Sequence, residues 1–359
     1  METTGTHHDR AFAEALGAKG WIASGWPVED GGGGRSWLEQ VVISQELSAA
    51  EAPTAGIGTT MLVANTLRLW GTPDQKQKVL PGIVSGEIQV CLGYSEADSG
   101  SDVAAARTRA VLDGDEWIIN GEKMFTSLAQ IADYVFLLTR TNLEVKKHKG
   151  LTMFLIPMTT PGVSVAEIKT LGGERTNITS YQDVRAPDSC RVGDVDGGWN
   201  VLTSALNFEH AVGYGPEIAR MLKVAVDEAS KPSADGSRLI DDPSVRARLA
   251  RIAIDVEVSD LLNLRAGWMG ATGRRVTSEG SMVKVYSSEA LARATAQLLD
   301  IFGPAGLGQG GGHGASGLGV LEHGFRHSQV TRIYAGTSEI HRSIIAERGL
   351  GLPRTRSAG

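Results

Sequence analysis

Hydrophobic residues recur at intervals of three and four over residues 12–87, which is the pattern of amphipathic helices. The pattern is clearest over residues 38–47 and 61–70, and four consecutive glycines interrupt it at 31–34. We therefore expect residues 1–87 to form an N-terminal helical domain.

The clearest helix start in this part of the chain is at Thr72. Its hydroxyl can cap a helix, and Pro73 after it suits a first helical turn, whose N–H groups need no partner inside the helix. A helix is therefore predicted to begin here and to include residues 74–79.

The hydrophobic period shortens to two over residues 88–195, which predicts strands. The turn dipeptides Asp113-Gly114 and Asn120-Gly121 lie on either side of a short apolar run. The expected strands are residues 117–119, 134–139, 151–157 and 180–184. Such short strands separated by turns favour an antiparallel β-barrel domain.

Helical spacing returns after residue 196 and continues almost to the end of the chain. Pro216 predicts a break in the first of these helices, and the glycine-rich residues 303–319 predict a loop. The expected helical segments are residues 199–230, 242–271, 277–302 and 337–349. A C-terminal four-helix bundle over residues 196–359 would complete an α+β protein of three domains.

Composition excludes several classes of protein. The chain is 42% hydrophobic and 21% charged, so disorder is not expected. Its net charge of -6 gives no reason to expect a nucleic-acid partner. No apolar run is long enough to span a bilayer, and residues 1–10 lack the apolar core of a secretory signal. Cys91 and Cys190 do not suggest a disulfide framework, so we expect a cytoplasmic location and no membrane association.

Residues 92–102 combine a strand end with a loop of small, hydrogen-bonding residues. Such a loop offers backbone amides and hydroxyls that could bind a pyrophosphate or the edge of a flavin ring. An ordinary polar turn at the end of a strand is an equally good interpretation of the composition alone.

Residues 123–127 read Lys-Met-Phe-Thr-Ser. Phe125 could lie against a ring face while a neighbouring hydroxyl bonds the edge of the ring. Taken alone, Phe125 is better explained as a core residue.

Glu209 falls in an apolar stripe on a predicted helix, together with Leu202, Ala205, Leu206 and Val212. Burial would raise the pKa of such a carboxyl and would suit it to accept a proton from carbon. An ion pair between Glu209 and an arginine of a neighbouring helix is the simpler alternative.

Gly336-Thr337-Ser338 precedes an apolar run and predicts a helix start, whose free N–H groups can hold a phosphate or a carbonyl oxygen. Considered alone, this motif is only a capped helix. No sequence motif indicates a metal site.

Taken together, these stretches resemble the acyl-CoA dehydrogenase family over nearly the whole chain. Residues 95–102 are similar to its T-E-P-x-x-G-S-D loop, and residues 108–123 are similar to the run T-x-A-x-x-x-G-D-x-[YW]-x-[IV]-N-G-x-K that follows it. The resemblance implies an FAD cofactor and an acyl-CoA substrate.

The resemblance also implies roles for individual residues. Those expected to bind the cofactor are Leu92, Gly93, Tyr94, Ser95, Ser101, Phe125, Thr126, Ser127, Thr337 and Glu339. Those expected near the substrate are Ser101, Asn207, His210 and Gly336.

The family usually has its catalytic glutamate just before the Gly-Thr pair, where this chain has Ala335. Some members instead have the base in a Leu-x-x-Glu-Arg pattern on the first long helix after the β domain. The matching residues here are Leu206 and Glu209, followed by His210 in place of arginine. Glu209 is therefore the predicted catalytic base, and His210 is expected to alter how the substrate is anchored.

Two regions depart from the family's pattern for the distant half of the cofactor, which a neighbouring subunit holds. They are residues 236–243 and 300–304. Such a chain is expected in a tetramer, such as an α2β2 complex with a second dehydrogenase-like chain. Residues 25–27 and 31–34 are similar to the actinobacterial branch that degrades steroid side chains with α2β2 enzymes. The resemblance begins near residue 12, as if the first family helix were missing.

The expected reaction introduces a 2,3 double bond into an acyl-CoA, with a bulky, branched or steroid-type acyl group favoured. Electron-transfer flavoprotein or a similar protein is the expected acceptor. Two alternatives retain the fold: a non-catalytic partner subunit, and an acyl-CoA oxidase that passes electrons to oxygen. A pure binding module is a third alternative, with little in the sequence to favour it.

Overall fold

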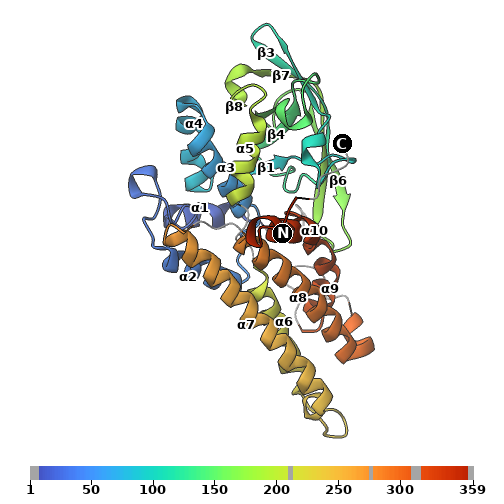
Figure 1. The fold of residues 1–359 in the computed structure, drawn as a ribbon. Helices are drawn as coiled ribbons and strands as arrows, with labels where there is room; N and C mark the ends of the chain where they lie inside the picture. Colours follow the sequence, from blue (N-terminus) through green and yellow to red (C-terminus); the bar gives the residue numbers. More distant parts are fainter. Residues whose placement is uncertain (1–7, 209–212, 275–277, 309–316, 355–359) are drawn as a thin grey trace. The chain divides into compact units, whose positions relative to one another are not determined.

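The computed structural model describes residues 8–208, 213–274, 278–308 and 317–354. The described residues form two compact units, each with its own hydrophobic core (Figure 1). The first unit falls within residues 1–43, 53–170 and 174–209, and the second within 44–52, 171–173 and 210–359.

The first unit begins with helices, as expected. They are α1 (Arg10–Ala18), α3 (Ile57–Trp70) and α4 (Pro73–Ser85), and the unit also contains α5 (Gly198–Phe208) and the first half of α2 (Trp37–Ala49). The helical patterns at residues 38–47 and 61–70 are confirmed, since they fall within α2 and α3.

The start of α4 has the predicted cap. Thr72 accepts a hydrogen bond from the Gln75 amide at 3.2 Å, and the Gln75 side chain accepts one from the Thr72 amide at 3.0 Å. We expect Thr72→Ala to lower the free energy of unfolding by about 1 kcal/mol, because it leaves a helix N–H without its acceptor. Urea denaturation measures the effect, with Thr72→Ser as the control that keeps the hydroxyl. Equal stability of the alanine and serine variants would contradict this role.

The β part of the first unit is one eight-stranded sheet. Its strands are β1 (Val90–Gly93), β2 (Arg109–Asp113), β3 (Glu116–Lys123), β4 (Tyr134–Arg140), β5 (Leu151–Pro157), β6 (Val163–Lys169), β7 (Arg175–Pro187) and β8 (Arg191–Val192). They follow the order β6-β7-β3-β2-β4-β5-β8, with β1 paired to β4. This path is open, so the expected closed barrel is not found among the described strands. The pairings β1–β4 and β2–β4 are parallel, so the sheet is not purely antiparallel.

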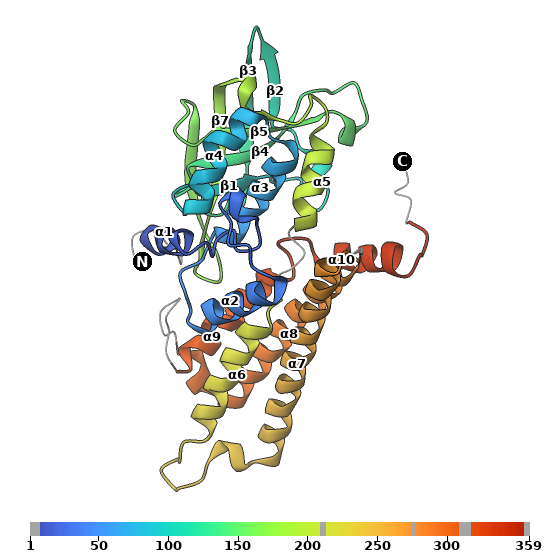
Figure 2. The same ribbon diagram turned by 90° about the vertical axis from the view of Figure 1, so that its left-hand side faces the viewer.

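The central strands β4 and β5 are apolar on both faces because each face has its own core. Phe136 and Leu138 join the cluster that packs against α3, α4 and α5, which lie together over one face of the sheet (Figures 1 and 2). Val135 and Leu137 alternate with them and join a second cluster that includes Trp117. This two-sided burial explains the nearly continuous apolar runs that predicted these strands.

The turn predicted at Asn120-Gly121 is wrong. β3 continues through this dipeptide to Lys123, and the register with β7 shifts between Ile119 and Gly121. Between these paired positions Asn120 of β3 faces two residues of β7, Gln182 and Asp183, so the extra residue of this β-bulge belongs to β7. The other predicted turn is confirmed, since Gly114 has φ +68° between β2 and β3.

The second unit is helical. Its described helices are α6 (Gly215–Ala229), α7 (Pro243–Ala271), α8 (Glu279–Phe302), α9 (Gly319–Thr331) and α10 (Ser338–Ile344), and a π-helical turn (Ile345–Gly349) follows α10. α6 to α9 lie side by side around a core that includes Met221, Ile252 and Leu291 (Figure 2). The predicted break at Pro216 is confirmed, because α5 and α6 are separate helices. α9 was not predicted from the sequence.

Cys91 and Cys190 are free thiols. Burial raises the pKa of the Cys91 thiol to about 12, which keeps it protonated and unreactive. Among the described helices, none combines the length and apolar character needed to cross a membrane.

Candidate functional site

The predicted loop follows β1, which ends at Gly93. The amides of Glu96 and Ser99 bond each other's carbonyl oxygens, which folds residues 96–99 into a tight turn. The amides of Ser95 and Ala97 donate to no acceptor within the described part of the chain. The Ser99 hydroxyl is buried and also has no partner among the described residues. The loop therefore presents several donors that a ligand could use.

Segment 123–127 lies beside this loop, as the cofactor hypothesis requires. The Met124 amide donates to the Ser95 carbonyl at 2.9 Å. The next residue, Phe125, has φ +61° and its side chain is 61% exposed. The alternative that Phe125 belongs to the core is therefore wrong, and its ring is open to a partner outside the described residues.

The two polar residues after Phe125 each contact a threonine hydroxyl of β7. Ser127 Oγ lies 3.0 Å from Thr176 Oγ1 at an exposed position. The Thr126 side chain is buried, with its hydroxyl 3.2 Å from Thr179 Oγ1. Ser127 can thus offer its hydroxyl to a ligand, whereas the buried Thr126 hydroxyl lies against Thr179.

Asn177 fixes the backbone on either side of Thr126, the residue after Phe125. Its carbonyl accepts from the Thr126 amide at 2.8 Å, and its side chain donates to the Thr126 carbonyl at 3.0 Å. This support was not predictable from the local sequence, because Asn177 lies more than 50 positions away on β7. The left-handed conformation of Phe125 is held by these contacts.

The other predicted residues of this loop vary in exposure. Leu92, Tyr94 and Ser95 are half-buried, Gly93 is buried, and Ser101 is exposed. A Cβ at Gly93 would lie 2.9 Å from side-chain carbons of Leu137 and Val135, so this position requires glycine.

A buried ion pair within the first unit holds the loop that follows β1. It was not predicted from the sequence. Lys123 Nζ lies 2.8 Å from Glu96 Oε1, and the two side chains are 0% and 11% exposed. Lys123 also donates to the Tyr94 carbonyl at 3.3 Å. The Glu96 carboxylate accepts from the amides of Arg107 and Thr108 at 2.7 and 2.8 Å. The signal available in the sequence was a lysine at an inward-facing position of a strand, which requires a counter-charge.

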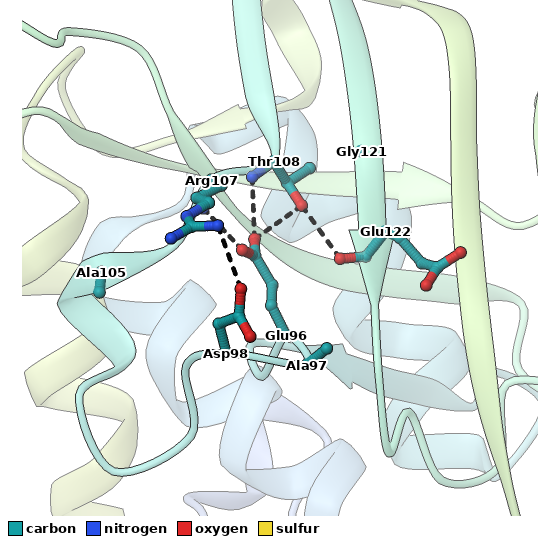
Figure 3. A pocket seen from close by; sticks show the side chains of 8 residues that line it. All are labelled: Glu96, Ala97, Asp98, Ala105, Arg107, Thr108, Gly121 and Glu122. Atoms are coloured by element: carbon teal, nitrogen blue, oxygen red, sulfur yellow. Dashed lines mark hydrogen bonds and ion pairs between the residues drawn. The ribbon is translucent and has the colours of Figure 1, made fainter.

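A hollow of about 240 Å³ opens around Glu96 (Figure 3). Its lining residues are Glu96, Ala97, Asp98, Ala105, Arg107, Thr108, Gly121 and Glu122. Phe125 and Ser95 do not line it, and its volume is below the roughly 300–1,000 Å³ of typical ligand sites. Figure 3 shows the Glu96 carboxylate directed at Thr108 and Arg107 directed at Asp98. The hollow is thus lined by the supporting network and lies apart from the exposed ring of Phe125.

The remaining cofactor candidates belong to the second unit. Thr337 caps α10 by accepting from the Ile340 amide at 3.2 Å, so the predicted helix start is confirmed. Gly336 before it has φ +87°, and Glu339 is exposed on the first turn. Ala335, at the usual place of the catalytic glutamate, has φ +52°.

The apolar stripe that led to Glu209 is present on α5. Leu202 and Ala205 are fully buried, and Leu206 packs against the same core. Glu209 and His210 lie outside the described residues, as does the side chain of Asn207.

The residues in the first unit fit a flavin. An exposed aromatic ring, unused amides at Ser95 and Ala97, and the unpartnered buried hydroxyl of Ser99 lie along two adjacent segments. An isoalloxazine ring needs an apolar face and donors along its edge, and these segments provide both.

Comparison with known proteins gives the same assignment over almost the whole chain. Residues 1–87, 91–184 and 196–350 match the N-terminal, middle and C-terminal domains of acyl-CoA dehydrogenase. The chain is 38% identical to acyl-CoA dehydrogenase FadE26 of Mycobacterium tuberculosis over 347 residues, which cover 94% of this chain and 86% of that protein.

Two solved structures are similar along nearly their full length. The ChsE4-ChsE5 complex from Mycobacterium tuberculosis has a TM-score of 0.87 and 36% identity, covering 96% of this chain and 90% of the matched chain. The Tcur3481-Tcur3483 steroid ACAD has a TM-score of 0.88 and 36% identity, covering 98% and 92%. These similarities confirm the resemblance to the actinobacterial, steroid-type branch. The chain therefore belongs to the acyl-CoA dehydrogenase family of flavoprotein oxidoreductases.

Proposed function

We propose that this chain is an FAD-dependent acyl-CoA dehydrogenase that introduces a 2,3 double bond into an acyl-CoA thioester. The observation that carries the proposal is the exposed ring of Phe125, which lies beside the amides of Ser95 and Ala97. These amides donate to no acceptor within the described residues, and Asn177 holds the backbone that follows Phe125. Phe125 would cover one face of the flavin ring, and Ser127 would bond its edge. This part of the cofactor site would be completed by Leu92, Gly93, Tyr94, Ser95, Ser101 and Thr126. Thr337 and Glu339 would contact the dinucleotide.

Glu209 is the proposed catalytic base. Its carboxylate would take a proton from C2 of the acyl group, and Ala335 cannot do so from the usual family position. A bound FAD would supply the acceptor for the hydride that leaves C3. Backbone donors near Gly336 would stabilise the negative charge that develops on the thioester oxygen. Ser101, Asn207 and His210 would contact the substrate.

A bulky, branched or steroid-type acyl group is the proposed substrate. The support is the similarity to a structure described as a steroid ACAD, together with a base on the helix after the β domain. The mixed α2β2 tetramer is likewise a proposal, supported by the fact that both similar structures are named for two chains. Electron-transfer flavoprotein, or a protein like it, is the proposed acceptor. We propose a cytoplasmic location, which suits the free thiols of Cys91 and Cys190.

One experiment tests the function and the assembly together. The chain is produced alone and with a second dehydrogenase-like chain encoded beside it, and each preparation is analysed by native mass measurement and flavin absorbance. Four CoA thioesters are then supplied with a dye acceptor: butyryl-CoA, isobutyryl-CoA, octanoyl-CoA and the thioester of a steroid with a carboxylated side chain. Pivaloyl-CoA is the control, because it has no hydrogen on C2.

We expect dye reduction with at least one of the four thioesters and none with pivaloyl-CoA. One flavin per pair of unlike chains supports the mixed tetramer, and a homotetramer with a flavin in every subunit rejects it. Absence of flavin from every preparation of this chain, with no thioester oxidised, would replace the proposal with the non-catalytic subunit. Stoichiometric peroxide formation in air would replace it with the oxidase.

A further inference from the structure

The second unit contains a buried lysine that has no role in the proposed reaction as described above. Lys284 of α8 is 6% exposed. Its ammonium lies 4.5 Å from the centre of the Tyr334 ring and 5.5 Å from that of Tyr214. The hydroxyls of these two tyrosines are joined by a 2.9 Å hydrogen bond. A buried ammonium loses its hydration, and an apolar side chain of similar volume often serves stability as well or better.

Lys284 acts on the peptide group that leads into Ala335. Its ammonium donates to the Tyr334 carbonyl at 2.9 Å, and its Nζ lies 3.4 Å from the Tyr214 hydroxyl. That carbonyl belongs to the same peptide group as the Ala335 N–H. A cation on the carbonyl oxygen polarises the peptide and makes its N–H a stronger donor.

His341 fixes the next peptide group. Its Nε2 lies 2.9 Å from the Ala335 carbonyl, and its Nδ1 lies 3.0 Å from Ser281 Oγ on α8. Burial lowers the pKa of His341, so the ring is neutral and Nε2–H donates while Nδ1 accepts. A Cβ at Gly336 would lie 2.6 Å from this ring, so only glycine fits against it.

In the turn at Ala335 and Gly336, the carbonyls of Tyr334 and Ala335 are thus hydrogen-bonded to side chains, whereas the amides point to no acceptor within the described residues. Both residues have positive φ, +52° and +87°, a conformation that an alanine adopts only when its surroundings impose it. Within the described part of the chain, neither the Ala335 nor the Gly336 N–H has an acceptor. Two fixed, unused donors next to a polarised peptide suit an oxygen atom that gains negative charge.

We propose that Lys284 is a positioning residue of the dehydrogenation. It fixes and polarises the Tyr334–Ala335 peptide, so that the amides of Ala335 and Gly336 hold the thioester oxygen as the C2 proton leaves. The proposal rests on the proposed function, because it assigns the thioester to this turn.

Two variants distinguish the two effects of Lys284, which are the hydrogen bond that holds the turn and the charge that polarises its peptide group. Lys284→Met removes both the donor and the charge, and Lys284→Gln keeps a donor without the charge. Lys223→Met is the matched control, since this lysine of α6 is exposed and pairs with Asp227. All proteins are prepared as the flavin-loaded complex, and kcat and KM are measured with the four thioesters named above. Hydrogen exchange is measured on the same proteins without thioester, in peptides that span residues 332–340.

We expect Lys284→Met to lower kcat about 10- to 100-fold, with KM changed less than about threefold, because the lost interaction forms mainly in the transition state. Lys284→Gln should fall between Lys284→Met and the wild type. The amides of Tyr334 and Ser338, which bond Val330 and Arg332 carbonyls around the turn, should exchange faster in Lys284→Met. Lys223→Met should match the wild type in all three measurements.

Wild-type kcat and wild-type exchange in Lys284→Met would overturn the proposal, as would a change confined to KM. If Lys284→Met fails to fold, Lys284→Gln decides by the same criteria. If the wild type oxidises none of the thioesters, the proposed function fails by itself. The exchange measurement then still decides the holding role: faster exchange in Lys284→Met supports it, and unchanged exchange overturns it.

Discussion

Glu209→Gln is expected to keep the yellow cofactor and to lower dehydrogenation about 10²- to 10⁴-fold, the usual contribution of a general base. Glutamine has nearly the same shape as glutamate but cannot accept a proton from C2. The helix before this residue supports the assignment, because Leu202, Ala205 and Leu206 form a buried apolar stripe that leads to it.

The measurement is the turnover of the best thioester with a dye acceptor, alongside the exchange of the C2 hydrogen with D2O. Both should fall together, since both require removal of the same proton. Glu228→Gln is the matched control, because Glu228 lies on α6 and pairs with Lys231 at the surface. Flavin absorbance should be equal in all three proteins. Turnover of Glu209→Gln within about threefold of the wild type would remove Glu209 as the base.

The elements predicted well are those whose stabilising contacts lie close in sequence or whose surroundings are entirely apolar. The strand at residues 151–157 matches β5 because both of its faces are buried, so the apolar run has no polar interruption. The start of α4 was predicted because Thr72 and Pro73 are adjacent start signals, and the cap that forms involves Gln75 only three positions further on. In both cases the determining interactions are visible in a short window of sequence.

The errors arise where distant residues decide the structure. Asn120-Gly121 favours a hairpin turn by itself, but pairing with β7 keeps both residues within β3, opposite a bulge in β7. Helix α9 was missed because buried polar residues obscure its period. Glu322 is buried against Arg326, and Ser328 meets Thr295 of α8 at 3.1 Å. Such polar residues read as surface positions until their partners are known.

The candidate site shows the same division. The family-like motifs located the loop and Phe125, and the structure brings the two together through Met124 and Ser95. Their supports were not predictable from local pattern, because Asn177 and the Glu96–Lys123 pair come from separate strands and loops. Roles on the cofactor and the substrate remain proposals that the variants above test.

Lys123→Met is expected to lower the free energy of unfolding by about 3–5 kcal/mol, the usual effect of removing one partner of a buried ion pair. Lys123 is fully buried and 2.8 Å from Glu96. Its loss would leave the carboxylate partly buried with only the amides of Arg107 and Thr108 as close donors, together with the Thr108 hydroxyl. Because Lys123 also holds the Tyr94 carbonyl, flavin affinity should fall with stability.

The pH dependence of stability provides a second test. Burial lowers the pKa of Lys123 from 10.5 to about 8, although Glu96 opposes the shift. Partial burial works against the charge of Glu96, but Lys123 outweighs it and holds the Glu96 pKa below its usual 4.5. A carboxyl with a lowered pKa stabilises the fold above its unfolded pKa, and that stability is lost as the pH falls. An ammonium with a lowered pKa destabilises the fold below about pH 8 and ceases to do so as the pH rises toward 10.5.

The wild type should therefore lose stability below about pH 4.5 and gain it between about pH 8 and 10.5. Lys123→Met should lack the gain at high pH. Its loss at low pH should be smaller, because Glu96 without its cation protonates more readily in the folded protein and its pKa then differs less from the unfolded value. Urea denaturation from about pH 3 to about pH 10.5 measures both changes.

The double variant Lys123→Met/Glu96→Gln distinguishes the ion pair from the packing around it. If charge is the cause, removing both charges should recover at least about 2 kcal/mol relative to Lys123→Met. Lys78→Met is the matched control, because Lys78 forms an exposed pair with Asp74 and should cost less than about 1 kcal/mol. A double variant as unstable as the sum of its two single variants would mean that the residues act independently. The loop would then depend on the shape of Lys123, and the pair could not be the electrostatic support of the flavin site.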